Sequence, residues 1–185
     1  MLRLLLLRHA EAVPSAGEGD VNRRLTADGE DAARRVGAYL AEIGALPDFA
    51  LVSPARRTLQ TLERLQEGAD RPFPRLVAPT LYDAAAAAVQ ALVEDAPAGV
   101  ASLLLVGHNP GLAEAAVAFA AFGEAAALRR LRSQFPAPAL ALIDFDSRNW
   151  REAARSVGRL GLFLTLASKE LQIRPQEAAP RRAPS

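Results

Sequence analysis

Two short, almost continuous apolar runs constrain the fold of this chain more than any other feature. Residues 2–7 read LRLLLL, and residues 102–106 read SLLLV. Runs of this length without polar alternation are typical of strands buried on both faces, as in a parallel sheet covered by helices on both sides. Further short apolar runs predict strands at residues 49–52, 76–77, 139–145 and 160–166.

Helical patterns separate most of these runs. Apolar spacing, alanine content and cap residues predict helices over residues 26–43, from residue 53 onward, over residues 83–93 and over residues 109–122. Pro54 is expected in the first turn of the second helix. Asn109 is expected to cap the last one, with Pro110 as its first residue. This alternation of strands and helices predicts a layered α/β fold with a largely parallel sheet.

The chain has 185 residues, which is most simply one domain with a sizeable core. Half of the residues are hydrophobic and the charged share is ordinary, as in a globular protein. We expect the domain to cover residues 1–172. The remaining residues, 173–185, are polar and rich in proline, and we expect this tail to be disordered.

Charge and composition exclude several classes of function. The formal net charge is +1, so neither nucleic acid nor an anionic membrane is expected as a partner. Cysteine is absent, which excludes disulfides, thiolate catalysis and cysteine-ligated metals. The first apolar run is too short for a signal peptide, and no run is long enough to span a membrane. A cytoplasmic protein is therefore expected.

Polar side chains follow three of the predicted strands. The first strand ends in Arg8-His9, the second is followed by Arg57 near a helix start, and the strand at residues 102–106 is followed by His108. Ligands of open α/β sheets bind beyond the carboxyl ends of the strands, where helix N-termini also favour anions. If these strands are parallel neighbours, both histidines and at least two arginines meet there. The pattern predicts a site for a small dianion, and a phosphoryl group is the natural candidate.

The choice of nucleophile follows from the residue types present. Without cysteine, serine, aspartate and histidine remain, and a neutral imidazole can attack phosphorus and form a covalent intermediate. Arginines crowded around His9 are expected to lower its pKa and keep the ring neutral. The arginines and His108 can stabilise the transferred charge without a metal, so no cofactor is expected.

Other kinds of site fit the residues less well. The two histidines could bind a metal ion with Glu11 or Asp83 as a third ligand, but adjacent arginines repel a cation. A Ser-His-Asp hydrolase would need a G-x-S-x-G elbow, which the sequence lacks. A P-loop would need its glycine pattern and a lysine, whereas Lys169 is the one lysine of the chain.

Three segments, LLLLRHAEA, LVSPARRTLQT and LLLVGHNPGL, resemble the signature segments of the histidine phosphatase superfamily. The S-P-x-x-R-x-x-Q-T pattern is the most specific, and the resemblance is clearest over residues 1–123. It implies a phosphoglycerate mutase-like fold, which is a three-layer α/β/α sandwich. The interval between His9 and His108 is too short for the insertions of the larger members. The chain is therefore most similar to the short SixA-type phosphohistidine phosphatases.

The resemblance also implies a role for each motif residue. His9 would be the phosphorylated nucleophile, and Arg8 and Arg57 would bind the phosphoryl oxygens. His108 would stabilise the transition state from the other side. The spacing after Ser-Pro selects Arg57 rather than Arg56 as the arginine that points into the site.

Four other residues lie near these motifs. Arg23 and Asp83 are further substrate-binding candidates, although an exposed salt bridge explains Arg23 about equally well and a helix cap explains Asp83 better. Ser53 is expected to be structural. Glu11 and Asp83 are the nearest candidates for a general acid, and this role stays open. A site without such an acid suits phosphohistidine, whose imidazole leaves more easily than an alkoxide.

These observations predict a phosphatase that forms a covalent phosphohistidine intermediate. Its substrate would be a phosphorylated histidine of a protein or a small phosphorylated molecule, with phosphate as the product. Two alternatives remain: a phosphomonoesterase of the same family that acts on a small metabolite, and a non-catalytic phosphate-binding module. The complete pair of histidines argues against the module.

Overall fold

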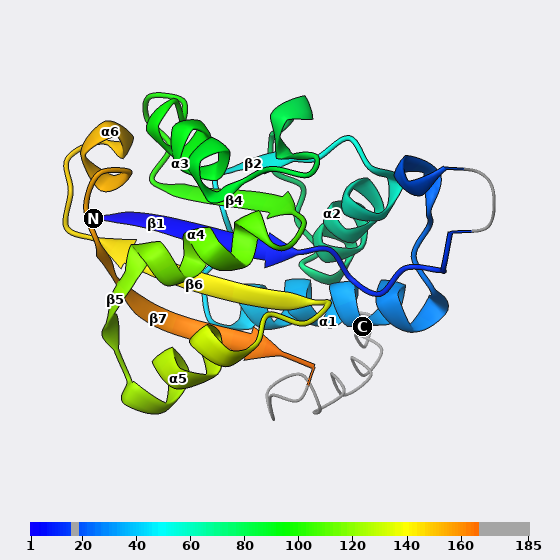
Figure 1. Ribbon diagram of the computed structural model, residues 1–185. Helices are drawn as coiled ribbons and strands as arrows, with labels where there is room; N and C mark the ends of the chain where they lie inside the picture. Colours follow the sequence, from blue (N-terminus) through cyan, green and yellow to red (C-terminus); the bar gives the residue numbers. More distant parts are fainter. Residues whose placement is uncertain (16–18, 167–185) are drawn as a thin grey trace, which may run out of the picture.

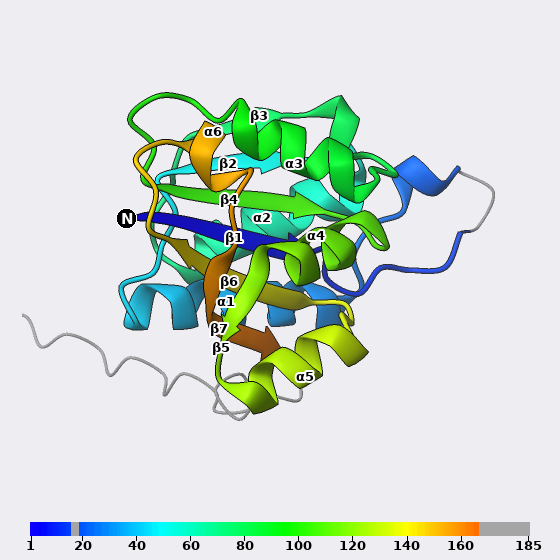
Figure 2. The same ribbon diagram turned by 60° about the vertical axis from the view of Figure 1, so that its left-hand side comes forward.

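The computed structural model describes residues 1–15 and 19–166. Within these ranges the chain builds a seven-stranded sheet with the order β3-β2-β4-β1-β6-β7-β5 (Figure 1; β3 is labelled in Figure 2). Neighbouring strands are parallel except around β6, which runs antiparallel to both β1 and β7. The strands are β1 (Leu2–Arg8), β2 (Phe49–Val52), β3 (Arg75–Val77), β4 (Ser102–Gly107), β5 (Ala120–Gly123), β6 (Ala139–Phe145) and β7 (Gly158–Thr165).

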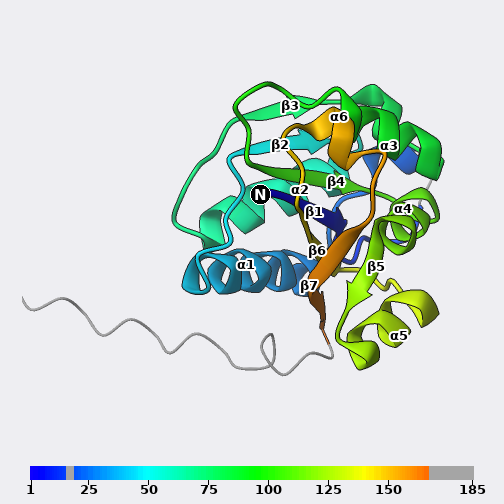
Figure 3. The same cartoon turned by 90° about the vertical axis from the view of Figure 1, so that its left-hand side faces the viewer.

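Helices cover both faces of the sheet, as the view in Figure 3 shows. Helices α1 and α2 lie on one face, α3, α4 and α6 lie on the other, and α5 packs beside β5 and β7. The predicted α/β fold with three layers and a largely parallel sheet is confirmed. The helices are α1 (Ala27–Glu42), α2 (Arg56–Gly68), α3 (Ala86–Glu94), α4 (Gly111–Phe119), α5 (Ala125–Ser133) and α6 (Trp150–Ala153), with short 3-10 helices η1 (Asp20–Asn22) and η2 (Pro79–Leu81).

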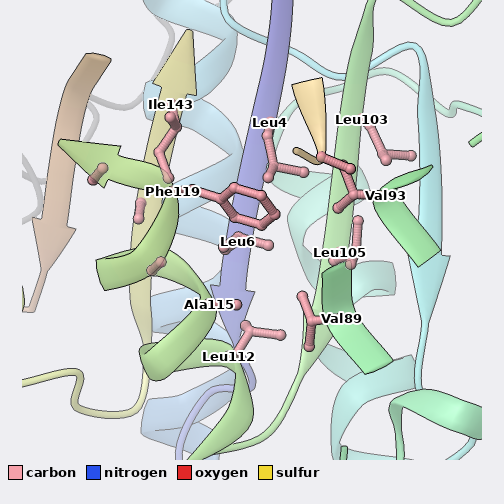
Figure 4. Packing of buried hydrophobic residues seen from close by; sticks show 14 of the residues in the cluster. Leu4, Leu6, Val89, Val93, Leu103, Leu105, Leu112, Ala115, Phe119 and Ile143 are labelled. Carbon is pink, nitrogen blue, oxygen red and sulfur yellow. The ribbon is translucent and has the colours of Figure 1, made fainter. Parts of the chain in front are cut away.

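Alternate leucines of β1 face opposite sides of the sheet. Leu4 and Leu6 pack under α3 and α4 (Figure 4), whereas Leu5 and Leu7 pack against α1 and α2. All four side chains are fully buried, and burial of each contributes about 1.5–3 kcal/mol. Because both faces are covered, the strand needs apolar residues at successive positions, which explains the nearly continuous run in the sequence.

Two glycines allow α1 and α2 to pack backbone against backbone. A Cβ atom at Gly37 would overlap the carbonyl oxygen of Leu65, and one at Gly68 would overlap the carbonyl oxygen of Arg34. This close contact fixes α2 against its neighbour, and the first turn of α2 carries Arg57. The packing therefore contributes to the placement of a predicted site residue.

The segment around α4 differs from the sequence-based prediction. Asn109 is not the helix cap: Pro110 occupies the cap position, and the Asn109 amide donates to the carbonyl oxygen of Phe135 at 2.8 Å. The helix ends at Phe119, earlier than predicted. Residues 120–123 instead pair with β7 as the short strand β5, because the sheet edge offers them backbone partners.

Two further helix starts were predicted too early. Helix α2 begins after Pro54, because Ala55 has extended backbone angles and takes the cap position. Helix α3 begins at Ala86, because Asp83 has a positive φ of 49° that interrupts helical geometry. Asp83 is therefore not the cap of α3, and that expectation is wrong. Helix α5 was not predicted.

The tail predicted at residues 173–185, and the domain end predicted at residue 172, lie outside the described residues. Within the described part of the chain, no helix has both the length and the apolar character needed to cross a membrane.

Candidate active site

Three parallel strands end side by side at one edge of the sheet. Arg8 at the end of β1 lies in register with Gly107 at the end of β4, and β4 pairs on its other side with β2 (Figure 2). His9 and His108 follow these strand ends directly, and their ring centroids lie 5.3 Å apart. The backbone N–H of His9 donates to the carbonyl oxygen of Gly107 at 3.1 Å, which extends the strand pairing. The strands therefore bring together two histidines that are far apart in the sequence.

The imidazole of His9 is buried and held by one backbone contact. Its Nδ1 lies 2.7 Å from the carbonyl oxygen of Ala10. A carbonyl only accepts, so Nδ1 carries the ring proton and Nε2 keeps its lone pair. Burial lowers the pKa of His9 to about 4; the Ala10 hydrogen bond opposes this shift, and the nearby positive groups add to it. His9 is therefore neutral near pH 7 with Nε2 free to attack, although burial rather than the predicted arginine charges is the main cause.

The second histidine has both ring nitrogens engaged by the protein. Arg57 Nη2 lies 3.2 Å from His108 Nδ1, and Ser53 Oγ lies 2.8 Å from Nε2. A guanidinium group only donates, so Nδ1 accepts and Nε2 carries the proton that it donates to Ser53. Burial, followed by the charge of Arg57, lowers the pKa of His108 to about 4. Ser53, which is expected to be structural, therefore fixes the tautomer of His108.

The arginines of the site come from different elements. Arg57 is buried in the first turn of α2, whereas its neighbour Arg56 is exposed. The prediction that Arg57 is the inward arginine agrees with this geometry. Arg8 is half-buried, and its Nη1 donates at 2.8 Å to the carbonyl oxygen of Phe135, which also accepts from Asn109. The connection between α5 and β6 therefore orients Arg8.

Two buried donors at the site lack acceptors. The Nε–H groups of Arg8 and Arg57 have no hydrogen-bond partner among the described residues. Buried donors are nearly always paired in folded proteins, so unpaired ones call for an explanation. Two cationic side chains with unmet donors beside a free imidazole nitrogen form a site suited to an anionic group that undergoes nucleophilic attack.

Three other predicted residues occupy different positions. Arg23 reaches the site indirectly: its Nε donates to the carbonyl oxygen of Val13 at 2.7 Å, and its Nη1 donates to Asp20 at 3.0 Å. Asp83 is exposed on the connection before α3. Glu11 is also exposed, and its backbone oxygen accepts from the N–H of Thr26 at 3.0 Å. The structure does not bring the carboxyl groups of Asp83 and Glu11 into contact with the histidines.

Two residues of the site were missed in the sequence. Asp20 accepts from Arg57 Nη2, and the Tyr82 hydroxyl donates to the same carboxylate, both at 2.8 Å. The Tyr82 ring also meets the His108 ring edge-on at 5.4 Å. Hydrogen bonds from Arg23, Tyr82 and Arg57 hold the pKa of Asp20 well below its usual range, and Asp20 in turn raises the pKa of Tyr82. Tyr82 could have been found because it precedes Asp83, a predicted substrate-binding residue. Nothing in the loop sequence distinguishes Asp20.

Metal ligands do not gather in the described part of the chain. Within residues 1–15 and 19–166, no three histidine or carboxylate side chains are arranged to hold a metal ion. The alternative of a metal site made of both histidines and Glu11 or Asp83 is therefore not formed by the described residues.

Comparison with known proteins agrees with this geometry. Residues 4–78 match the family model of the histidine phosphatase superfamily (branch 1). An uncharacterized protein from Mycobacterium tuberculosis is 31% identical over 139 residues, which are 74% of this chain and 85% of that protein. An uncharacterized chloroplastic protein from Arabidopsis thaliana is 32% identical over 124 residues, which are 62% of this chain. The match spans only 57% of the Arabidopsis protein.

Solved structures extend the likeness to nearly the whole fold. The SixA protein from Nakamurella multipartitia superposes with a TM-score of 0.77 at 28% identity, and covers 90% of this chain and 97% of its own. The SixA protein from Agrobacterium tumefaciens gives a TM-score of 0.74 at 30% identity, with 89% and 97% covered. With the family model and the strand-end geometry, these matches show that the chain belongs to the histidine phosphatase superfamily and resembles its SixA-type members.

Proposed function

We propose that this protein is a phosphatase that acts through a phosphorylated His9, with phosphohistidine as its substrate. The observation that carries the proposal is the state of His9. Its ring is neutral, its Nδ1–H is held by the Ala10 carbonyl, and its Nε2 lone pair is free beside Arg8 and Arg57. A neutral imidazole in this state is a competent nucleophile toward phosphorus.

The first step forms one bond to phosphorus and breaks another. The second ring nitrogen of the substrate imidazole takes a proton from solvent. Nε2 of His9 then attacks, the bond between phosphorus and the substrate nitrogen breaks, and the imidazole leaves in its neutral form. Arg8 and Arg57 supply the positive charge that the phosphoryl oxygens need. The Nδ1–H of His9 stays on the Ala10 carbonyl and stabilises the cationic phosphorylated ring.

The second step regenerates the enzyme. Water attacks the phosphorus, the bond to Nε2 breaks, and His9 returns to its neutral form while orthophosphate leaves. The proton released by the attacking water balances the one consumed by the departing imidazole. The sum of both steps is hydrolysis of phosphohistidine to histidine and orthophosphate.

The carboxyl groups around the site favour phosphohistidine over phosphate esters. Alkoxide leaving groups need a general acid, but Glu11 and Asp83 do not contact the histidines. Asp20 does reach the site, yet its lowered pKa keeps it ionised, so it has no proton to give at neutral pH. The Nakamurella and Agrobacterium proteins are both named as candidate phosphohistidine phosphatases of the SixA type, which agrees with this substrate.

A substrate panel tests the proposal. Protein treated with EDTA is assayed with a phosphohistidine peptide, p-nitrophenyl phosphate and sugar phosphates, next to His9→Ala. We expect the phosphohistidine peptide to be hydrolysed fastest, EDTA to have no effect, and His9→Ala to abolish turnover. Full activity of His9→Ala would disprove the covalent mechanism. Faster hydrolysis of a sugar phosphate would favour the phosphomonoesterase, and tight phosphate binding without turnover would favour the binding module.

A further inference from the structure

Asp20 accepts hydrogen bonds from Arg57, the arginine that is expected to hold the phosphoryl group. Its carbonyl oxygen accepts from Arg57 Nη1 at 2.6 Å, and its carboxylate accepts from Arg57 Nη2 at 2.8 Å. Arg57 is buried, whereas about half of the Asp20 side chain is exposed at the mouth of the site. One residue thus takes two of the hydrogen-bond donors of this guanidinium group.

Arg57 keeps its Nε–H and one Nη1–H for a second anion. A guanidinium group has five N–H donors. Nη2 directs one to Asp20 and one to His108, which uses both of its hydrogens, and Nη1 gives one to the Asp20 carbonyl. A phosphoryl group binds arginine best through two parallel N–H donors. While Asp20 keeps its contacts, a phosphoryl group cannot accept parallel hydrogen bonds from both Nη1 and Nη2 of Arg57.

The carboxylate of Asp20 also stays negatively charged at neutral pH. Arg23 donates to one of its oxygens at 3.0 Å, and the Tyr82 hydroxyl donates at 2.8 Å to the other, which also accepts from Arg57. These contacts keep it ionised across the neutral range. A phosphoryl dianion placed on Arg57 would lie within a few ångströms of this charge and be repelled by it.

We propose that Asp20 is a resident counter-anion of Arg57 that incoming phosphoryl groups must displace, and that it thereby sets the affinity of the site for phosphorylated substrates and for orthophosphate. The inference rests on the proposed function in one respect, namely that Arg57 receives the phosphoryl group. Removing the charge of Asp20 should tighten phosphate binding, because the competitor and the repulsion disappear together. A residue that merely oriented Arg57 would have the opposite effect, since its loss would loosen phosphate binding.

Calorimetric titration with orthophosphate tests this without any turnover. Asp20→Asn keeps the shape of the side chain and removes its charge. We expect its dissociation constant for orthophosphate to fall by about two- to fivefold relative to the wild type, the range of a partly exposed ion pair. Asp146→Asn is the matched control, since it removes the same charge from the opposite end of the sheet and should leave the constant unchanged. An unchanged or increased constant for Asp20→Asn would overturn the inference.

A second variant and a second readout keep the test decisive. Tyr82→Phe removes one hydrogen bond to the Asp20 carboxylate while its charge stays, and should tighten orthophosphate binding by a smaller factor. With a phosphohistidine peptide, kcat/KM of Asp20→Asn should rise through a lower KM, in step with the tighter orthophosphate binding. A fall in kcat/KM would assign Asp20 an orienting role and refute the counter-anion.

The two proposals fail separately in these experiments. Tighter orthophosphate binding by Asp20→Asn in a protein that hydrolyses no phosphohistidine would sustain the counter-anion and reject the proposed function. Phosphohistidine hydrolysis that depends on His9, together with unaltered orthophosphate binding by Asp20→Asn, would sustain the proposed function and reject the counter-anion.

Discussion

The neutral state of the two buried histidines should be visible in the stability of the fold. The pKa of each ring is about 4 in the folded protein, against 6.5 for an unperturbed histidine. Between these values an unfolded chain binds a proton at each ring that the folded protein does not bind. The free energy of unfolding must therefore fall as the pH falls from about 6.5 towards 4.

The magnitude follows from the two pKa values. Acidification from pH 7 to pH 5 lowers the free energy of unfolding by about 2 kcal/mol for each histidine, or about 4 kcal/mol for both. At a pH above 6.5, the pKa in the unfolded chain, the two neutral rings cost the folded protein no stability. Below that pH, the free energy of unfolding falls. The loss levels off near pH 4, where the folded protein also takes up the protons. A change of about 4 kcal/mol is a large part of the stability of an ordinary domain.

Urea denaturation at pH 7, 6 and 5, followed by circular dichroism, measures this effect. The wild type is compared with His9→Gln and His108→Gln, each of which removes one titrating ring. Each variant should lose about 2 kcal/mol rather than about 4 kcal/mol over this range. A wild-type free energy of unfolding that is constant from pH 7 to pH 5 would refute the reasoning, as would a loss that neither substitution reduces.

Two further substitutions test the contacts of the site. Arg57→Ala should lower kcat/KM for a phosphohistidine peptide by about 100-fold or more in steady-state assays, because it removes charge from the phosphoryl site. Arg56→Ala, at the adjacent exposed residue, should stay within about twofold of the wild type, and equal losses would contradict the assignment. Ser53→Ala leaves the His108 Nε2–H without its acceptor, so urea denaturation at pH 7 should show a loss of about 1–3 kcal/mol.

Strand positions were predictable because burial on both faces of the sheet requires apolar residues at successive positions. Leu4 to Leu7 had to be apolar in succession, and the same holds for the leucines of β4. Strand β5 was missed because AAFG continues an alanine-rich helical segment, and only β7 supplies its backbone partners. Local propensity cannot reveal a partner that comes from residues 158–165.

The site was predictable to the extent that strand ends determine it. Arg8, His9 and His108 follow β1 and β4 directly, so a parallel pairing of those strands is enough to bring them together. The contact of Asp20 with Arg57 depends instead on the path of a loop, and loop sequences carry no periodicity that reports such a path. The contact between Ser53 and His108 could not be predicted either, because His108 follows a different strand.

The proton positions in the site lead to a last prediction about leaving groups. The imidazole proton of His9 is held by the Ala10 carbonyl, that of His108 by Ser53, and Asp20 is ionised, so these groups hold no proton ready for a departing alkoxide. Phosphohistidine avoids this problem, because its second ring nitrogen can carry a proton before the bond to phosphorus breaks. For phosphate esters, kcat/KM should fall steeply as the pKa of the leaving alcohol rises. A series of substituted phenyl phosphates and an alkyl phosphate measures the slope; a flat dependence would show that a general acid operates in this site.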